Sequence, residues 1–408
     1  MRVLQICFVL LLPLALWTGA VADSHASDDC CEVTIEVQVP AGTGTVYLAG
    51  SLDQLGPWRP DGLELGGEGT MRRTVLTLPR GTELEYKFTL GSWQREGLGP
   101  SGTVMANFRL TVADDARQQH QVVDFKKDPM QYIADWRRSG VRGTLVYWTD
   151  VPSQFLEQDR HVSVWLPPEY QQQPERRFRV LYMHDGQNLF DPRIANTGVD
   201  WGVDESLVRL VSEGMMDPVI VVAAWSSSER GAEYSPWHRA PDYARFLIEE
   251  LMPRVNREYR TLTGPDNTAV MGSSMGGLLS FYLVSRHPEV FGACGCVSSH
   301  FILSESVAAR FIPSTVGDPD ETPYILLDIE DGLRVPQGTR YWFDYGSEGL
   351  DGEYGPTHAA VQQWLERQGL EQGSDFVVRL YEGADHNEAS WRERLADPLL
   401  FLFGEVLE

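Results

Sequence analysis

Two patterns of hydrophobic and polar positions divide the chain. Between residues 32 and 125, short apolar runs alternate with a two-residue period, and turns containing Gly or Pro separate them. This period is typical of strands with one buried face. The predicted strands are Val33–Val39, Val46–Ala49, Thr74–Leu78, Leu84–Leu90, Phe108–Val112 and Val122–Phe125. The pattern predicts an antiparallel, immunoglobulin-like β-sandwich of about seven strands as a domain over residues 30–127.

A different pattern begins after a short predicted linker, residues 128–140. Apolar strands now alternate with helix-length segments, so residues 141–408 are predicted to form an α/β domain with a mainly parallel sheet covered on both faces. The predicted strands are Leu145–Thr149, Val162–Leu166, Arg179–His184, Val219–Ala224, Thr268–Ser273, Gly292–Ser298, Arg340–Tyr345 and Phe376–Tyr381. The predicted helices are Asp204–Glu213, Tyr243–Asn256, Met275–Ser285, Thr357–Gln368 and Ala389–Leu402.

The first residues of the chain are typical of a secretory signal. Residues 3–22 carry no charge and end in small residues at the A-x-A spacing, so we expect cleavage after Ala22, or after Ala26. The alternative is an uncleaved anchor, because about 20 apolar residues can span a bilayer. With a cleaved signal over residues 1–22, the protein is expected to be secreted or periplasmic and to keep no stable membrane span.

Composition excludes some classes of function. The chain has 34 Lys and Arg against 58 Asp and Glu, for a formal net charge of −24, and no basic run that could follow a phosphate backbone. Nucleic-acid binding is therefore not expected. Cys294 and Cys296 would share one face of a strand, and neither they nor Cys30 and Cys31 have partners at zinc spacing. No metal site is expected.

The segment Thr268–Leu278 contains an apolar strand, the pattern G-x-S-x-G around Ser274, and an apolar helix. A serine in such a sharp turn needs small neighbours, and we expect a Cβ at Gly272 or Gly276 to collide with the packed strand and helix. The turn also aims the free N–H groups of the helix amino end at the serine hydroxyl. Ser274 is the predicted nucleophile.

A serine nucleophile needs a base, and in this fold class the base follows it in the sequence. The candidates are His300, His358 and His386. His386 lies in a loop after the last predicted strand, at the carboxyl edge of the sheet. His300 precedes any plausible acid loop and His358 sits at a helix start, so both are interpreted as structural or rim residues. His386 is the predicted base.

The acid that orients the base is expected after the strand Arg340–Tyr345. Two carboxylates, Glu348 and Asp351, lie in the loop that follows, whereas Asp344 is still in the strand. Asp351 is preferred, and Glu348 stays open as the alternative.

The loop His184–Asp191 is expected to supply the second oxyanion donor. Gly186 allows the chain to turn back, so that the N–H of Gln187 joins the N–H of Met275 near Ser274. Asp185 and Asn188, on the same loop, are assigned to substrate binding. This chemistry requires no cofactor.

Residues 141 to 405 resemble the esterase D or enterochelin-esterase group of α/β-hydrolases, which also includes feruloyl and acetylxylan esterases and mycolyltransferases. The matching pieces are Leu181–Asp191, Arg230–Pro236, Gly272–Gly277, Phe343–Asp351 and Glu382–Trp391. The resemblance implies an α/β-hydrolase fold and a serine carboxylic ester hydrolase. One departure is Gly349, which occupies the place where relatives often carry the acid.

The first domain is similar to starch-binding carbohydrate-binding modules in Val46–Trp58 and in the residues from Leu78 to Trp93. By that resemblance Trp58, Lys87 and Trp93 would bind a glycan, with indole rings stacking on the apolar face of a pyranose. Phe108 departs from the Asn-Arg pair of such modules. The alternative is that these residues only define the fold.

The predicted protein is thus an exported serine esterase that acts through an acyl-enzyme on small-molecule or polysaccharide esters. Glycan-linked acyl groups, with feruloyl or acetyl esters foremost, are the preferred substrates. A siderophore esterase, an acyltransferase and a non-catalytic glycan-binding protein are the alternatives.

Overall fold

The computed structural model describes residues 30–100, 104–127, 130–133, 140–308 and 322–404. These form two compact units. The first contains the described residues up to Gly91 together with Met105–Asp124, and the second contains the rest, including Ser92–Val104. The expected signal, residues 1–22, lies outside the described residues. Within the expected linker, helix α1 (Met130–Ile133) is described.

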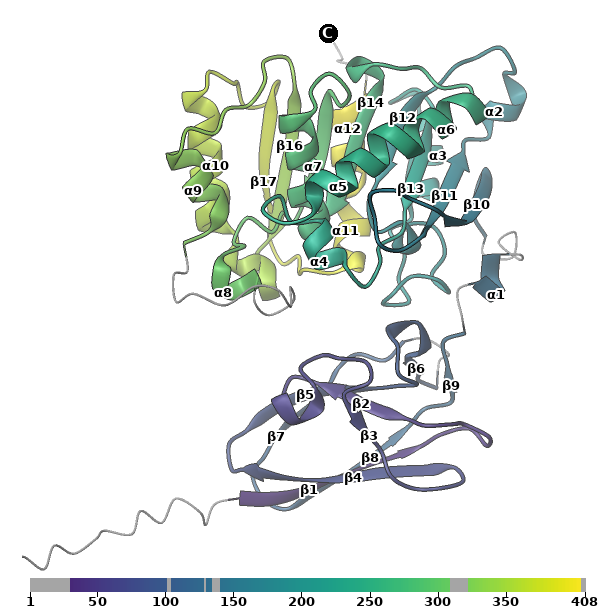
Figure 1. The fold of residues 1–408 in the computed structure, drawn as a ribbon, viewed down its shortest axis with the longest axis vertical. Helices are drawn as coiled ribbons and strands as arrows, with labels where there is room; N and C mark the ends of the chain where they lie inside the picture. The colour runs from purple at the N-terminus through teal and green to yellow at the C-terminus, as the bar shows by residue number, and fades with distance from the viewer. Residues whose placement is uncertain (1–29, 101–103, 128–129, 134–139, 309–321, 405–408) are drawn as a thin grey trace, which may run out of the picture. The chain divides into compact units, whose positions relative to one another are not determined.

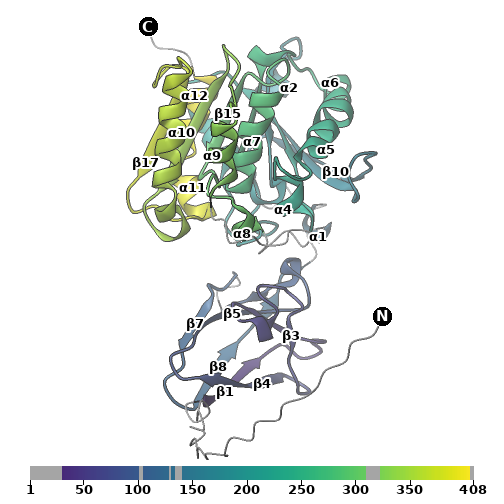
Figure 2. The same ribbon diagram turned by 60° about the vertical axis from the view of Figure 1, so that its left-hand side comes forward.

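The first unit is all-β and has two sheets (Figures 1 and 2). One sheet has the order β4-β1-β8, from Met71–Pro79, Cys30–Gln38 and Ala116–Gln121. The other has the order β3-β2-β5-β7, from Leu63–Glu64, Tyr47–Gly50, Glu83–Thr89 and Phe108–Thr111. The Tyr86 hydroxyl of β5 lies 2.8 Å from Nε2 of His120 on β8, so the two sheets meet through their inner side chains. The immunoglobulin-like topology stays a prediction.

Two expectations about this unit are wrong. β8 pairs with β1 in parallel, so the unit is not purely antiparallel. β8 was not predicted, because its sequence ARQQHQ has no apolar alternation, although its side chains alternate between half-buried and exposed. The expected strand Val122–Phe125 reduces to β9 (Asp124–Phe125).

The boundary between the two units also differs from the expected one. We expected residues 30–127 to form one domain, but Ser92–Val104 is grouped with the second unit. The N–H of Lys126 donates to the carbonyl of Glu96 at 2.8 Å within that unit. The segment contains β6 (Gly97–Leu98).

The second unit is built on one eight-stranded sheet. Its order is β10-β11-β13-β12-β14-β15-β16-β17. The strands are β10 (Thr144–Val151), β11 (Arg160–Leu166), β12 (Arg179–Met183), β13 (Val219–Ala224), β14 (Thr268–Ser273), β15 (Ala293–Val297), β16 (Arg340–Gly346) and β17 (Phe376–Tyr381). β11 is antiparallel to both of its neighbours, β10 and β13. The six strands β12 to β17 are parallel to one another. The expected α/β architecture is confirmed.

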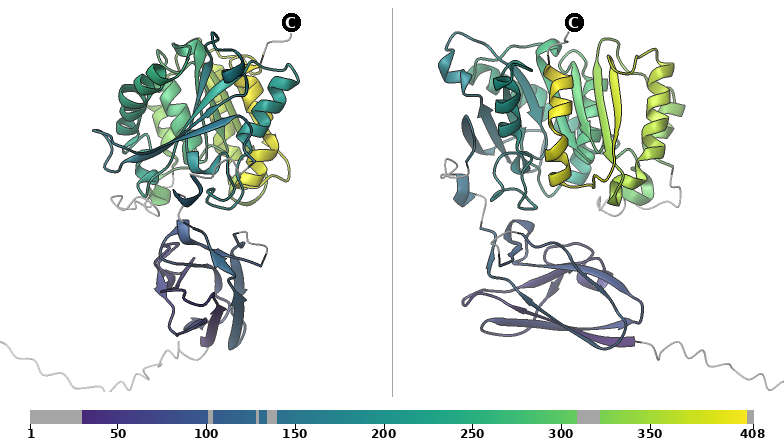
Figure 3. Two further views of the ribbon diagram at one scale, coloured as in Figure 1. Left: turned by 90° about the vertical axis from the view of Figure 1, so that its right-hand side faces the viewer. Right: turned by 180° about the vertical axis from the view of Figure 1, so that it is seen from behind.

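Helices cover both faces of this sheet (Figures 1 and 3). One face carries α5 (Ala240–Arg245), α6 (Met252–Glu258), α7 (Met275–Arg286) and α10 (Gly355–Arg367). The other carries α3 (Val203–Ser212), α11 (Glu388–Arg394) and α12 (Ala396–Phe403). Shorter helices are α2 (Glu169–Gln172), α4 (Arg230–Glu233), α8 (Glu305–Ala308) and α9 (Tyr324–Glu330). A π-helical turn, Phe246–Leu251, joins α5 to α6, so the expected helix Tyr243–Asn256 is interrupted.

Strand side chains alternate between two hydrophobic cores. Val180 and Tyr182 point into the core under α7, whereas Leu181 and Met183 point into the core under α3 and α12. Cys294 and Cys296 both lie in the first core, on one face of β15 as expected, and their Sγ atoms are 2.8 Å apart. Because β12 to β17 are parallel, the loops that follow them meet at one edge of the sheet. Within the described residues, no helix has the length and apolar character to cross a membrane.

Candidate active site

Ser274 occupies the turn between β14 and α7, with φ of +56° and ψ of −123°. A non-glycine residue rarely adopts this conformation, which costs about 1–3 kcal/mol and is typical of functional sites. The N–H of Ser274 donates to the Val297 carbonyl at 3.0 Å, and this bond helps to hold the turn. A Cβ at Gly272 would lie 2.8 Å from the backbone of Gly276, as expected. A Cβ at Gly276 would approach His184 only to 3.4 Å, so the collision expected there is wrong.

His386 lies after β17, in a loop whose two flanks are held. Asn387 caps α11 by accepting from the N–H of Ser390 at 3.0 Å. The hydroxyl of Ser390 accepts from the N–H of Asp385 at 3.1 Å. The imidazole is packed edge-on against Trp391, with ring centroids 5.1 Å apart. These contacts place His386 at the carboxyl edge of the sheet.

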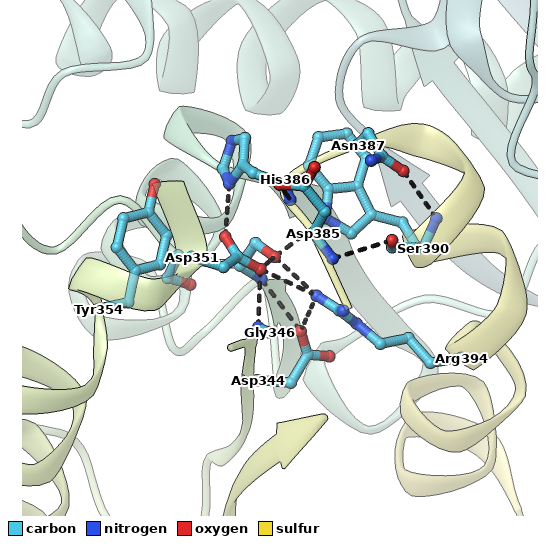
Figure 4. A network of polar contacts seen from close by, with 12 residues as sticks. Asp344, Gly346, Asp351, Tyr354, Asp385, His386, Asn387, Ser390 and Arg394 are labelled. Carbon is cyan, nitrogen blue, oxygen red and sulfur yellow. Dashed lines mark hydrogen bonds and ion pairs between the residues drawn. The ribbon is translucent and has the colours of Figure 1, made fainter. Parts of the chain in front are cut away.

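Asp351 is the carboxylate that reaches this imidazole (Figure 4). Its Oδ1 lies 2.6 Å from Nδ1 of His386, and the residue is fully buried. Glu348, the alternative acid, is exposed. The reason is the 3-10 helix Gly349–Glu353, which turns Asp351 inward. Gly349 has φ of +56°, and a Cβ there would lie 2.0 Å from Oδ1 of Asp385.

The second oxygen of Asp351 is also fully used. It accepts from the N–H of Gly346 at 2.8 Å and from the hydroxyl of Ser298 at 2.5 Å. Burial raises the pKa of Asp351, but the hydrogen bonds from His386 and Ser298 outweigh burial, so its pKa is below the usual range. The carboxylate is therefore ionised at neutral pH.

Behind Asp351 lies a buried arginine shared by two carboxylates. Nη2 of Arg394 is 3.0 Å from Oδ1 of Asp344 and 3.5 Å from Oδ2 of Asp351 (Figure 4). The same nitrogen donates to the Ser298 hydroxyl at 2.6 Å, and Trp391 Nε1 donates to that hydroxyl at 2.9 Å. Sequence reasoning missed Ser298 and Arg394. Ser298 could have been found from its position, because it directly follows the parallel strand β15.

Replacing Arg394 with methionine is expected to lower the free energy of unfolding by about 3–5 kcal/mol, because two buried carboxylates lose their cation. Arg379→Met is the matched control. Arg379 pairs with Asp397 at 2.7 Å, but the two side chains are 49% and 38% exposed, so the expected loss is about 0–1 kcal/mol. Urea unfolding of both variants checks this, and equal losses would contradict it.

The loop after β12 forms a 3-10 helix, Gly186–Asn188. The side chain of Gln187 is fixed by two bonds to Ser226: Nε2 donates to Oγ at 2.8 Å, and Oε1 accepts from the N–H at 3.1 Å. Among the described residues, the backbone N–H groups of Gln187 and Met275 have no hydrogen-bond partner. Both N–H groups are thus available to an oxyanion.

Asp185 and Asn188 have partners within the protein. The Asp185 carboxylate forms a two-point ion pair with Arg230, with both N–O distances at 2.7 Å. Burial raises the pKa of Asp185, but Arg230 outweighs burial, so the pKa is below its usual range. Oδ1 of Asn188 accepts from the N–H of Asn196 at 2.9 Å. Asn188 thus holds the loop, and a contact of either residue with substrate stays a prediction.

His300 and His358 are buried on the α10 side of the site. Burial is the main cause that lowers the pKa of His300 to about 3 and that of His358 to about 4. Both imidazoles are therefore neutral at neutral pH. Nδ1 of His358 donates to the Tyr354 carbonyl at 3.0 Å, so its proton is on Nδ1.

The low pKa of His358 predicts a pH-dependent contribution to stability. In the unfolded chain His358 has a pKa of about 6.5, so below this pH the unfolded chain binds a proton that the folded chain does not. The free energy of unfolding therefore decreases as the pH is lowered from about 6.5 to about 4. In His358→Gln this loss is absent. The stability difference between wild type and variant should shrink by about 1 kcal/mol from pH 6 to pH 5. Urea unfolding at the two pH values measures it, and a constant difference would contradict it.

The residues expected to bind glycan are divided between the two units. Trp58 is 36% exposed in a turn, with φ of +53°, and Lys87 lies half-buried on β5. Trp93 lies in a 3-10 helix of the segment grouped with the second unit. Phe108 is half-buried and packs against His120, with ring centroids 3.9 Å apart. Glycan binding stays a prediction.

Among the described residues, no group of three or more His, Cys, Asp or Glu could hold a metal ion.

Comparison with known proteins finds several that are similar in sequence to part of this chain. The chain is 20% identical over 260 residues to the uncharacterized protein YbbA of Bacillus subtilis (strain 168), covering 60% of this chain and 94% of that protein. It is 26% identical over 176 residues to an endo-1,4-beta-xylanase/feruloyl esterase of Xylanibacter ruminicola, covering 40% of this chain and 21% of that protein. A solved ferulic acid esterase aligns with a TM-score of 0.49 and 20% identity, covering 64% of this chain and 98% of that one. The sequence profile of the Esterase family, described as "Putative esterase", matches residues 153–402. This match spans more than half of the chain, which therefore belongs to the Esterase family.

Proposed function

We propose that this protein is a serine esterase that works through an acyl-enzyme. Ser274 Oγ attacks the ester carbonyl while His386 takes its proton, and the proton passes to the leaving alcohol as the C–O bond breaks. Water then attacks the acyl carbonyl by the same proton transfer and releases Ser274. The observation that carries this proposal is the hydrogen bond between the buried Asp351 and the half-buried His386, at the sheet edge where Ser274 is raised on a strained turn.

The surroundings of the site support each step electrostatically. An ionised Asp351 holds the proton of His386 on Nδ1, which leaves Nε2 to accept the proton of Ser274, and it stabilises the imidazolium that forms. The N–H groups of Gln187 and Met275 would bind the oxyanion of the tetrahedral intermediate. One such donor is worth about 3–4 kcal/mol of transition-state stabilisation. The loop after β12 would therefore supply a donor worth about 10²- to 10³-fold in kcat.

For the substrate, we propose an acyl group linked to a glycan, with feruloyl and acetyl esters foremost. Membership of the Esterase family and the feruloyl esterase named among the relatives support this choice. A panel of methyl ferulate, acetylated xylan and a trilactone siderophore separates it from a siderophore esterase. Adding sugar alcohols during hydrolysis and searching for new esters separates it from an acyltransferase.

A fluorophosphonate reagent tests the nucleophile directly, because it phosphonylates an activated serine. We expect one adduct per chain, located on Ser274 by peptide mass spectrometry. Ser274→Ala should abolish the adduct, and Ser273→Ala, which changes the neighbouring buried serine, should keep it. An absence of labelling in the wild type would contradict the esterase proposal and favour a non-catalytic protein.

A further inference from the structure

Tyr354 places a second hydroxyl beside the proposed nucleophile. It follows the 3-10 helix that carries Asp351 and is fully buried. Its hydroxyl lies 2.7 Å from Nδ1 of His300. The Ser274 side chain is near enough to this hydroxyl to lower the pKa of Tyr354, although burial, the larger influence, raises it. Its ring is edge-on to His386, with centroids 5.7 Å apart and planes at 82°. None of the steps above uses this hydroxyl.

His300 is fixed to the same turn as the nucleophile. Its backbone N–H donates to the Ser274 carbonyl at 3.2 Å. Burial lowers the pKa of His300 to about 3 and raises that of Tyr354, so a neutral imidazole faces a neutral phenol at neutral pH. The neutral imidazole can carry its one proton on Nδ1, toward Tyr354.

Counting protons fixes the direction of the bond during the reaction. Once Ser274 Oγ has given up its proton, this oxygen can only accept hydrogen bonds. The Tyr354 hydroxyl, which has a single proton, can then contact Oγ only as the donor. The Tyr354 oxygen remains able to accept from Nδ1–H of His300. With its proton on Nδ1, His300 would orient the Tyr354 proton toward Oγ.

We propose that Tyr354, oriented by His300, is a further catalytic residue that donates a hydrogen bond to Ser274 Oγ and speeds hydrolysis of the acyl-enzyme. The inference rests on the proposed function. His386 takes a proton from water as the water oxygen bonds to the acyl carbon. When the bond between that carbon and Oγ breaks, its electron pair goes to Oγ, which receives the proton back from His386. Tyr354 keeps its own proton and stabilises the charge that develops on Oγ.

The same hydrogen bond acts differently in the two half-reactions. During acylation Oγ donates electron density to the carbonyl carbon, so a donor on Oγ does not assist the attack. During deacylation Oγ is the leaving atom, and a donor lowers the free energy of its departure. Loss of the hydroxyl should therefore slow deacylation more than acylation.

Tyr354→Phe tests this difference with p-nitrophenyl acetate. We expect deacylation to slow by about 10- to 100-fold, the range for a hydrogen bond to a charged group. Acetylated protein should accumulate in intact-mass spectra, together with a burst of p-nitrophenol. Tyr341→Phe is the matched control: Tyr341 is buried with its hydroxyl 2.7 Å from Thr339 Oγ1, at the far end of β16 from the site. This variant should deacylate at the wild-type rate.

Variants of His300 keep the test decisive if Tyr354→Phe does not fold. His300→Ala should accumulate acyl-enzyme, and His300→Asn, which keeps a donor near Nδ1, should restore part of the deacylation rate. Wild-type deacylation in a folded Tyr354→Phe or in His300→Ala, or equal slowing of both half-reactions, would overturn the inference. Ser274→Ala distinguishes failure of the esterase proposal from failure of the Tyr354 proposal. If Ser274→Ala keeps full activity, the esterase proposal fails. If Ser274→Ala is inactive but Tyr354→Phe has wild-type kinetics, only the role of Tyr354 is wrong.

Discussion

Ser274→Ala is expected to lower kcat for p-nitrophenyl acetate by about 10⁴- to 10⁶-fold, the range seen when a triad nucleophile is removed. Without Oγ there is no acyl-enzyme, and what remains is the smaller contribution of the oxyanion donors and substrate binding. The fold should persist, because the bonds of this turn come from the backbone: Ser274 N–H to Val297, and His300 N–H to Ser274.

The measurement is the initial rate of p-nitrophenol release, with thermal unfolding as the check on the fold. Ser273→Ala again serves as the control, since Ser273 is the last residue of β14 and is buried. It should stay within a few-fold of wild type. A folded Ser274→Ala protein with a tenth or more of the wild-type rate would remove the nucleophile assignment.

Asp351→Asn should lower kcat by about 10⁴-fold, because an amide no longer selects the imidazole tautomer with its proton on Nδ1 and no longer stabilises the imidazolium. The contact that is lost is the 2.6 Å hydrogen bond to His386. Glu348→Gln makes the same chemical change three positions earlier, on an exposed side chain, and should leave kcat/KM unchanged. Steady-state kinetics of the two variants decide between the two acids. The opposite ranking would assign the role to Glu348.

Much of the second unit could be predicted because its central strands are buried on both faces. Val219–Ala224 and Thr268–Ser273 have the predicted bounds, since each is an apolar run ended by turn or helix signals. The edge strand Phe376–Tyr381 also has the predicted bounds, although only Phe376 in it is buried. β8 could not be predicted, because its inward positions are Ala116, Gln118 and His120. These residues lie in the sandwich because β8 pairs with β1, whose residues come 83 positions earlier in the chain.

The residues of the candidate site that belong to a local sequence motif could be predicted. Those that are brought together only by the tertiary structure stayed ambiguous. The G-x-S-x-G pattern is complete within five residues, and the structure places Ser274 in the strained turn that the pattern requires. The choice between Glu348 and Asp351 depends on which carboxylate the 3-10 helix turns inward, which spacing alone does not reveal. Arg394 was missed because its partners, Asp344 and Asp351, come from a strand and a loop more than 40 positions away.

Gly349 lies where a side chain would meet a close neighbour. A side chain at Gly349 would overlap the Asp385 carboxylate, and the backbone there has φ of +56°. A side chain at 349 would therefore require the Asp385 side chain to move and would strain the backbone. A variant that carries an acid at 349 should accordingly be made together with a small residue at 385.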